Sequence, residues 1–586
     1  MKRLDCARRD TFRPTATRHR NASRTAAGVA AVLAGSITFV LTASAERSPS
    51  DLRLALIEPQ ATVQADLPDD ALLEARGARI GHIEIEVDEI FEHALGVGLA
   101  TPYKLANGLH VSTRRATVQQ QLLFHAGERY RRRLLDETAR MLRGQRYLNE
   151  ASVAPVRYNE DNTVDVLVRV HDVWTLSPGF SFGRKGGENS TRIKFEDTNF
   201  LGLGKQISLA RSSDVDRSAW RVAYLDPNLF GSWWRLSTAY SSASDGSERG
   251  LALQRPFYAL DTRWSASFAA SDDRSAVSRY SLGRRVERLD MRSRRFDVGG
   301  GLSRGLHDGW VHRYLGGLRY DSRSFAAHPD GARANGVGAS IPEDRTIAYP
   351  WIGLELVEDD YVSTRNLDQI GRTEDLYLGR SARLEIGWAS TALGSTRSGA
   401  ILGGAMQAGM DLGREQYLIH SLDFHTRVEG GHLANGLLEL GSRYYRRQSP
   451  RRVLFASAST SLSSRLDPEE QLLLGGDNGL RGYPLRYQAG TASALLTLEE
   501  RFYTRWQPLR LFNVGAAMFF DAGRTWGRDE FAAASAGWLA DVGVGLRLGS
   551  ARSGLGNVLH IDLAFPLNGG HDIDGVQFLI ETRRSF

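Results

Sequence analysis

The chain has 586 residues, of which 42% are hydrophobic and 24% are charged, and its formal net charge is +6. This length exceeds that of one ordinary soluble domain. Residues 1–45 hold eight Lys or Arg against two Asp, so the rest of the chain is neutral. The charge therefore gives no basis for predicting a nucleic-acid-binding protein.

The first 45 residues have the pattern of a secretory signal peptide. A basic segment precedes the apolar run AAGVAAVLAGSITFVL, which ends shortly before Ala43-Ser44-Ala45, a small-x-small cleavage pattern. We expect export and cleavage after Ala45. An uncleaved membrane anchor is the alternative, but the run is short for a membrane-spanning helix. The single cysteine, Cys6, lies in this segment, so the mature chain would have no disulfide and no thiolate metal site.

A weakly patterned linker is predicted over residues 46–79, and a small α+β domain over residues 80–174. In RIGHIEIEV, Ile83 and Ile85 alternate with polar residues, which predicts a half-buried strand. Two amphipathic stretches predict helices, and ASVAPVRY and TVDVLVRVHDV predict two strands joined by the turn NEDN. The expected order is strand, helix, helix, strand, strand.

Residues 175–586 predict a membrane β-barrel. Segments of about ten residues alternate apolar with polar or small side chains between stretches rich in Gly, Ser, Asp and Asn. No run of 18 or more apolar residues follows Ala45, so any later membrane span must be made of strands. At about 25 residues per strand and connection, the segment predicts about sixteen antiparallel strands. A soluble all-β protein is the alternative, but the inward faces are too polar for its core. Tryptophans are expected near the lipid interfaces: Trp233, Trp234, Trp264 and Trp351.

The stretch LLLGGDNGLRGYPLRYQ, residues 472–488, places Arg481 among four glycines. Period-2 alternation turns Glu499 and Asp521, on two later strands, towards the barrel interior. A loop folded into the lumen would let the Arg481 guanidinium bind both carboxylates. The alternative is an exposed loop with Arg481 in solvent. Arg486 is assigned no lumenal partner.

Several of these segments resemble one family. GGDNGLRGYPL, LEERFY and FFDAGRTW are similar to the C-terminal region of the BamA/TamA-like outer-membrane assembly superfamily, also called the bacterial surface antigen family. FEDTNFLGLGKQ, AYLDPNLFG and RPFYALDTRW resemble its early strands and turns, and HAGERYRRRLLDETARMLRGQRYLNEASV resembles a POTRA domain. The resemblance implies POTRA domains before a sixteen-stranded barrel with an inward loop. One POTRA-like domain is found, whereas the general insertase carries several and two-partner secretion pores carry two.

The resemblance also implies roles for particular residues. The hydrophobic-Arg-Gly-aromatic motif of the inward loop falls on Leu480, Arg481, Gly482 and Tyr483, and its lumenal acidic partners fall on Glu499 and Asp521. Phe586 takes the place of the C-terminal aromatic that marks such barrels for assembly, although Arg584 stands where an apolar residue is usual. The strand with Ile83 and Ile85 would offer a sheet edge to unfolded clients.

The expected function is assembly, insertion or translocation of client polypeptides at the outer membrane of a Gram-negative cell, with the small domain in the periplasm. The resemblance further implies a weakly paired seam between the first and last strands, here near residues 176–183 and the end of the chain, which would serve as a lateral opening. A two-partner secretion pore and a passive diffusion porin are the alternatives. G-x-S-x-G, H-E-x-x-H, Walker and C-x-x-C motifs are absent from the sequence, so we expect no enzyme activity, cofactor or metal. Whether the client is protein or lipid stays open.

Overall fold

The computed structural model describes residues 67–88, 111–329, 341–508, 511–527, 537–550 and 558–583. The expected signal peptide, most of the expected linker, and Phe586 lie outside these residues. Within them, no helix has both the length and the apolar character needed to cross a membrane.

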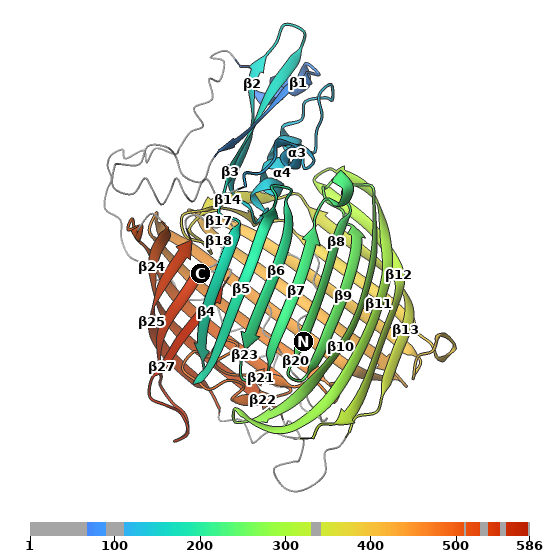
Figure 1. The fold of residues 1–586 in the computed structure, drawn as a ribbon, viewed down its shortest axis with the longest axis vertical. Helices are drawn as coiled ribbons and strands as arrows, with labels where there is room; N and C mark the ends of the chain where they lie inside the picture. The colour runs from blue at the N-terminus through green and yellow to red at the C-terminus, as the bar shows by residue number, and fades with distance from the viewer. Residues whose placement is uncertain are drawn as a thin grey trace.

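A three-stranded sheet with helices forms the N-terminal part of the described chain (Figure 1). Its order is β1-β3-β2, with β1 parallel to β3 and β2 antiparallel to β3. Within the described residues, the order along the chain is strand, helix, helix, strand, strand after one short helix, as the sequence predicts. The elements are α1 (Asp70–Ala75), β1 (Arg79–Asp88), α3 (Arg115–Gln119), α4 (Arg132–Arg143), β2 (Leu148–Tyr158) and β3 (Thr163–Asp172).

Helix α4 supplies much of this small domain's core. Its residues Leu135, Ala139 and Leu142 recur at spacings of three and four, so they lie on one face of the helix. All three are buried in one cluster with the alternating valines of β3, such as Val166 and Val168. The amphipathic pattern therefore determines which face of the helix packs on the sheet.

An antiparallel barrel follows the small domain (Figure 1). Its first ten strands are β4 (Leu176–Lys185), β5 (Glu188–Phe200), β6 (Lys205–Ser213), β7 (Ser218–Asp226), β8 (Arg235–Ala243), β9 (Gly246–Arg255), β10 (Trp264–Ser281), β11 (Arg284–His307), β12 (Trp310–Ala327) and β13 (Arg345–Glu358). The others are β16 (Ser381–Ala389), β17 (Gly399–Gly413), β18 (Gln416–Glu429), β19 (His432–Ser449), β20 (Arg452–Ser464), β23 (Ala492–Tyr503), β24 (Phe512–Trp526), β25 (Leu539–Ser550), β26 (Val558–Pro566) and β27 (Gln577–Arg583). Short 3-10 turns lie at Leu229–Gly231 and Thr391–Leu393.

The closed barrel contains 20 strands within the described residues, so the expectation of sixteen is wrong. Six strands, β4 to β9, occupy only residues 176–255. Strands β8 and β9, for example, are joined by Ser244 and Asp245 alone. The estimate failed because it allowed about 25 residues for each strand with its connection, which is too many where tight turns join short strands.

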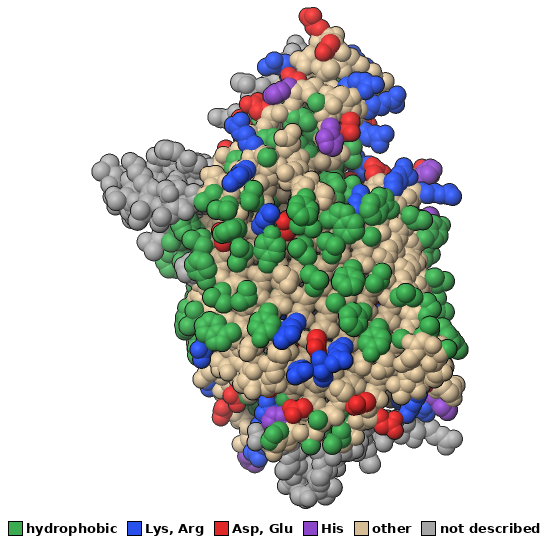
Figure 2. Space-filling model, turned by 45° about the vertical axis from the view of Figure 1, so that its right-hand side comes forward, with side chains coloured by type: hydrophobic (Ala, Val, Ile, Leu, Met, Phe, Trp, Pro, Cys, Tyr) green, Lys and Arg blue, Asp and Glu red, His purple; other side chains and the backbone are tan. Residues whose placement is uncertain are grey.

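The outer wall carries a broad band of hydrophobic side chains, with charged side chains gathered mainly beyond its two ends (Figure 2). Phe268, Val298 and Leu318 are examples of large apolar side chains on its exposed face. Each alternates along its strand with residues that point inward, which is the pattern of a wall between lipid and a polar lumen. Trp264 is 42% exposed on this wall, but Trp351 is buried in an interior cluster with Tyr349, so its expected interface position is wrong.

Two segments enter the barrel from opposite ends (Figure 1). The hairpin of β14 (Tyr361–Arg365) and β15 (Thr373–Tyr377) comes from the end that carries the small domain, here called the domain end. Leu367 at its tip lies in one buried cluster with Tyr445 and Tyr503 of the wall. The segment between β20 and β23, which contains β21 (Leu472–Leu474) and β22 (Gln488–Gly490), comes from the opposite end, here called the far end.

The small domain is fastened to the domain end by polar contacts. Arg143 of α4 donates two hydrogen bonds to Asp375 of β15, with Nε–Oδ2 and Nη2–Oδ1 distances of 2.7 and 2.6 Å. Arg146 reaches Glu196 of β5, with an Nη2–Oε2 distance of 3.2 Å. A bidentate Arg–carboxylate pair fixes orientation as well as distance. These contacts therefore define how α4 sits against the hairpin and the wall.

Glu137 of α4 adds a third contact between the small domain and the barrel. Its carboxylate accepts a hydrogen bond from the Leu260 amide at 2.8 Å, in the connection between β9 and β10. Burial raises the pKa of the Glu137 carboxyl, although this hydrogen bond and Arg133 act in the opposite direction. The small domain and the barrel are thus joined through three separate parts of the barrel's domain end.

We predict that Arg143→Glu releases the hairpin from α4. The Arg143 and Asp375 side chains are each 14% exposed, and a hydrogen-bonded ion pair of this kind contributes about 1.5–3 kcal/mol. Hydrogen exchange of the β14 and β15 amides should become faster, and the second change Asp375→Arg should slow it again. Arg157→Glu is the control because Arg157 is 68% exposed and its ion-pair distance to Asp165 is 4.0 Å. Unchanged exchange in Arg143→Glu would contradict the fastening role.

Candidate functional site

The loop between β20 and β23 is held inside the far end of the barrel. Its stem is the pair β21–β22, and its tip carries the glycine-rich stretch around Arg481. A Cβ atom at Gly482 would lie 2.7 Å from the Cβ of Asp541 on β25, so only glycine lets the loop approach the wall this closely. Gly479 has a φ of +128°, a backbone conformation that side chains disfavour.

Arg481 binds two carboxylates of the wall. Its Nε and Nη2 atoms donate to Asp521 of β24 at 2.6 and 3.0 Å, and its Nη1 atom donates to Glu499 of β23 at 3.1 Å. The guanidinium fork thus engages Asp521 with two nitrogens and Glu499 with the third. Asp562 of β26 lies 3.7 Å from Nη1. The structure brings together the arginine and both acids that the sequence singles out.

The surroundings of Arg481 explain why the pairing is strong. Arg481 is 2% exposed, and its guanidinium carbon lies 3.4 Å from the centre of the Phe519 ring. Burial alone would lower the pKa of Arg481, but the attraction of Asp521 and Glu499 outweighs burial and raises the pKa well above its usual value. The side chain is therefore a permanent cation that depends on these acids.

Tyr483 holds the other side of the loop tip. Its hydroxyl lies 2.8 Å from the Ala540 carbonyl oxygen and 2.7 Å from that of Asn568, and it accepts a hydrogen bond from the Ala540 amide at 3.1 Å. Both Tyr483 and Leu480 are fully buried in a cluster with Leu495 and other apolar side chains. The motif therefore combines one charged anchor, one hydroxyl anchor and one apolar anchor.

The charge network continues from the loop to the hairpin. Arg501 of β23 donates from Nε to Glu499 at 3.1 Å and from Nη1 to Asp368, at the hairpin tip, at 3.3 Å. Tyr445 also donates to Asp368, at 2.9 Å. Glu499 is thus shared between Arg481 from the far end and Arg501, which holds the hairpin from the domain end. The two inserted segments are connected by one chain of ion pairs.

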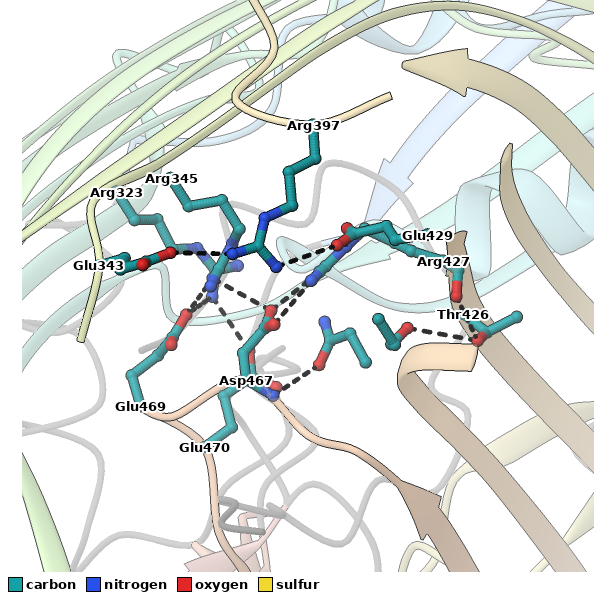
Figure 3. A network of polar contacts seen from close by, with 12 residues as sticks. Arg323, Glu343, Arg345, Arg397, Thr426, Arg427, Glu429, Asp467, Glu469 and Glu470 are labelled. Atoms are coloured by element: carbon teal, nitrogen blue, oxygen red, sulfur yellow. Dashed lines mark hydrogen bonds and ion pairs between the residues drawn. The ribbon is translucent and has the colours of Figure 1, made fainter. Parts of the chain in front are cut away.

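The base of the loop is fastened by a second network (Figure 3). Arg427 donates to Asp467 at 2.9 and 2.7 Å. Arg345 donates to Glu469 at 2.5 Å, and Arg323 forms an ion pair with the same carboxylate. Glu470 also belongs to this group, whose three acids lie close enough together to hold a metal. Because these arginines already bind the acids, the cluster serves as an anchor and is no candidate metal centre.

Arg486 also has partners, so the expectation that it has none in the barrel, and would tolerate alanine, is wrong. Its Nη1 atom donates to Asp216, in the turn between β6 and β7, at 2.8 Å. Its guanidinium carbon lies 4.3 Å from the centre of the Tyr280 ring, and Nε lies 3.5 Å from Asp477. The error arose because Asp216 is 270 positions away in sequence, and no alternation pattern relates a turn to a distant loop. Arg486→Ala should therefore also loosen the loop.

Parity along the strands located part of the network. It placed Glu499, Arg501 and Asp521 on the inward faces, and the structure buries all three. It also turns Asp562 of β26 inward, because Leu559, Ile561 and Leu563 face outward, but the sequence gave no reason to choose Asp562. Arg547 of β25, which forms an ion pair with Asp562, was missed for the same reason.

Ile83 and Ile85, the residues expected at a client-binding sheet edge, lie in an edge strand, but their side chains face the core of the small domain. Strand β1 is at the edge of its sheet. Ile85 is buried in the core of the small domain, and Ile83 packs against that core, whereas His82 and Glu84 between them are exposed. The Ile side chains are therefore poor contact points for a client. Phe586 lies outside the described residues.

Residues 389–583 match the family model described as the Omp85 superfamily domain. These residues comprise β17 to β27, the lumenal loop, Arg481 and its acidic partners. This part of the chain belongs to the Omp85 superfamily, and the resemblance to BamA/TamA-like proteins is confirmed. The protein is an outer-membrane β-barrel. No curated protein matches the chain.

Among solved structures, similarity is found to two kinds of protein. BamA from Haemophilus ducreyi lacking POTRA domains 1–3 is 13% identical, with a TM-score of 0.37, and the match covers 86% of this chain and 85% of that one. CdiB from Acinetobacter baumannii is 11% identical, with a TM-score of 0.42 and coverage of 86% and 74%. CdiB from Escherichia coli is 13% identical, with a TM-score of 0.45 and coverage of 86% and 76%. Likenesses at this level do not assign a role.

We predict that Arg481→Ala frees the loop tip. Removing one partner of a buried ion pair costs about 3–5 kcal/mol, and here Asp521 loses the arginine that binds it with two nitrogens. Hydrogen exchange of the amides around Leu480 and Tyr483 should accelerate. Arg481→Lys should restore protection only in part, because an ammonium group cannot make the planar two-nitrogen contact with Asp521. Arg451→Ala is the control, since Arg451 is exposed at the domain end. Equal rates of hydrogen exchange in Arg481→Ala and the control would show that Arg481 does not anchor the loop.

Proposed function

We propose that the protein assists the insertion or translocation of client polypeptides at the outer membrane. The small domain, a POTRA-like domain in the periplasm, receives an unfolded client, and the client reaches the membrane through the seam between β4 and β27. This role involves strand pairing and requires no chemical reaction, cofactor or metal.

The observation that carries the proposal is the seam itself. Strands β27 and β4 are in register at one residue pair, Ile580 with Arg184. Every other neighbouring pair of barrel strands within the described residues is in register over at least seven, as in β26–β27 and β13–β16. Unpaired backbone groups facing lipid are costly. A client strand that pairs with β4 or β27 would remove that cost, which gives it a physical reason to bind there.

The seam is held by few groups. Lys185 of β4 forms an ion pair with Glu581 of β27. A Cβ atom at Gly183 would lie 3.2 Å from the Ile580 carbonyl oxygen, so the strands approach closely at this point. One close approach and one ion pair can separate more easily than a ladder of seven or more residue pairs. The seam is therefore the weakest place in the wall.

The filled lumen makes the alternatives less suitable. A passive porin needs a continuous water path, but the hairpin packs Leu367 and Ile370 against wall residues such as Tyr445 and Tyr503. The loop buries Arg481 from the other end. A two-partner secretion pore would have to displace both segments and break the ion pairs that join them. A lateral route leaves both segments in place.

We predict that locking the seam stops client insertion. Arg184→Cys with Ile580→Cys should form a disulfide, because these residues are opposite each other in the register. The oxidised protein should lose client insertion, and a reductant should restore it. Phe182→Cys with Thr191→Cys is the matched control, since this pair joins β4 to β5, which are already in register over ten residue pairs. Full activity of the locked seam would contradict the lateral route.

We predict that clients contact β1, the edge strand of its sheet, beyond Ile80. Photo-crosslinking residues at the exposed positions His82 and Glu84 should capture client polypeptides in vivo. The same residue at exposed Glu160, in the turn between β2 and β3, is the control and should capture far less. Equal capture at all three positions, or capture of lipid alone, would remove the receptor role from this edge.

A further inference from the structure

An unusual group of arginines lies on the outer face of the wall. Outward-facing Leu251 and Phe296 flank Ala270 of β10 in the register. Two residues further towards the far end, Arg249, Asp272 and Arg294 lie side by side on β9, β10 and β11. Side chains two residues apart on a strand share a face, so these three also point outward.

The next outward position completes the group. Arg274 of β10 is opposite Arg292 of β11. We call Arg249, Arg274, Arg292 and Arg294 the outer arginine patch. Figure 2 shows a gathering of Lys or Arg side chains with an acidic one among them, below the main hydrophobic band on the face that turns towards the viewer.

The patch carries more positive charge than it neutralises. Arg292 binds Asp272 through Nε–Oδ1 and Nη2–Oδ2 distances of 2.9 and 2.7 Å. Arg249, Arg274 and Arg294 are exposed and make no hydrogen bond or ion pair with any residue that the structure describes. The guanidinium carbon of Arg249 lies 5.8 Å from the centre of the Tyr240 ring. Three guanidinium groups therefore keep free donors on the membrane side of the wall.

The position of the patch along the strands shows which part of the bilayer it faces. Asp272 follows the exposed Trp264 of β10 by eight residues. At about 3.4 Å per residue and a strand tilt of about 40°, the patch lies about 20 Å from Trp264 along the barrel axis, towards the far end. This distance is close to the height of the apolar band of a membrane barrel, which is about 25 Å. An outward arginine is costly at the middle of a bilayer and costs little at its interface. The patch thus meets lipid headgroups on the far-end side.

We infer that the outer arginine patch binds a lipid whose headgroup carries phosphate groups, as the glycolipid of the outer leaflet does. A guanidinium fork pairs with phosphate through two parallel hydrogen bonds, and outward Ser247 and Ser322 stand beside Arg274 and Arg294 in the register. Asp272 keeps one arginine oriented while the other three supply the charge. The assignment to the outer leaflet rests on the proposed periplasmic position of the small domain.

The test is binding of lipopolysaccharide to the purified full-length chain in detergent. The triple variant Arg249→Gln, Arg274→Gln, Arg294→Gln should bind it at least tenfold more weakly than the unchanged chain, while lipopolysaccharide with its phosphates removed should bind both equally. Arg304→Gln, at an exposed position near the domain end of the same strand β11, is the control and should bind normally. If the triple variant does not fold, the single variants should each bind severalfold more weakly.

Two results would overturn the inference: equal binding of lipopolysaccharide by the triple variant and the unchanged chain, or competition by inorganic phosphate at the concentration of lipid phosphate. The assay contains no client, so its outcome is independent of the insertion role. Orientation is tested separately by Ser244→Cys, in the far-end turn beside Arg249. Labelling of this cysteine from outside intact cells supports the outer leaflet, and its labelling only from the periplasm overturns that assignment.

Discussion

The burial of one guanidinium group constrains the interior of this barrel. Arg481 is 2% exposed, and a charge removed from water in this way is tolerated only when carboxylates and hydrogen bonds replace the water. Asp521 and Glu499 provide these from two adjacent strands. The loop must therefore bend at Gly479 and come within reach of the wall at Gly482. The position of the whole far-end insertion follows from that pairing.

The same requirement links the two ends of the molecule. Glu499 also accepts a hydrogen bond from Arg501, which reaches Asp368 at the tip of the hairpin. The hairpin is bound in turn to α4 of the small domain through Asp375 and Arg143. Two sets of charged pairs, one at each end of the hairpin, thus connect the small domain to the far-end loop through the hairpin. With the interior filled from both ends, the seam between β4 and β27 is where we propose that the wall opens.

Alternation along single strands predicted the wall and part of its interior from sequence. It distinguished outward Leu496 and Leu498 from inward Glu499 and Arg501, because a strand has only two faces. It could not predict the number of strands, because strand and turn lengths differ along the chain. Strands β4 to β9 are short and closely spaced, whereas later strands such as β11 are much longer. It also placed Ile83 and Ile85 in a strand, which the structure shows as β1, but it could not show how their side chains pack in the domain core.

The sequence by itself determined a β-barrel with a glycine-rich loop and an inward pair of acids, because period, turn residues and the loop motif are local properties of the chain. Only the tertiary structure decided what lies across the lumen. The pairing of Arg486 with Asp216, the insertion of Leu367 beneath the small domain, and the single register pair between β4 and β27 all join residues far apart in sequence. Such contacts depend on how the closed sheet places its strands in space, and no local pattern encodes that placement.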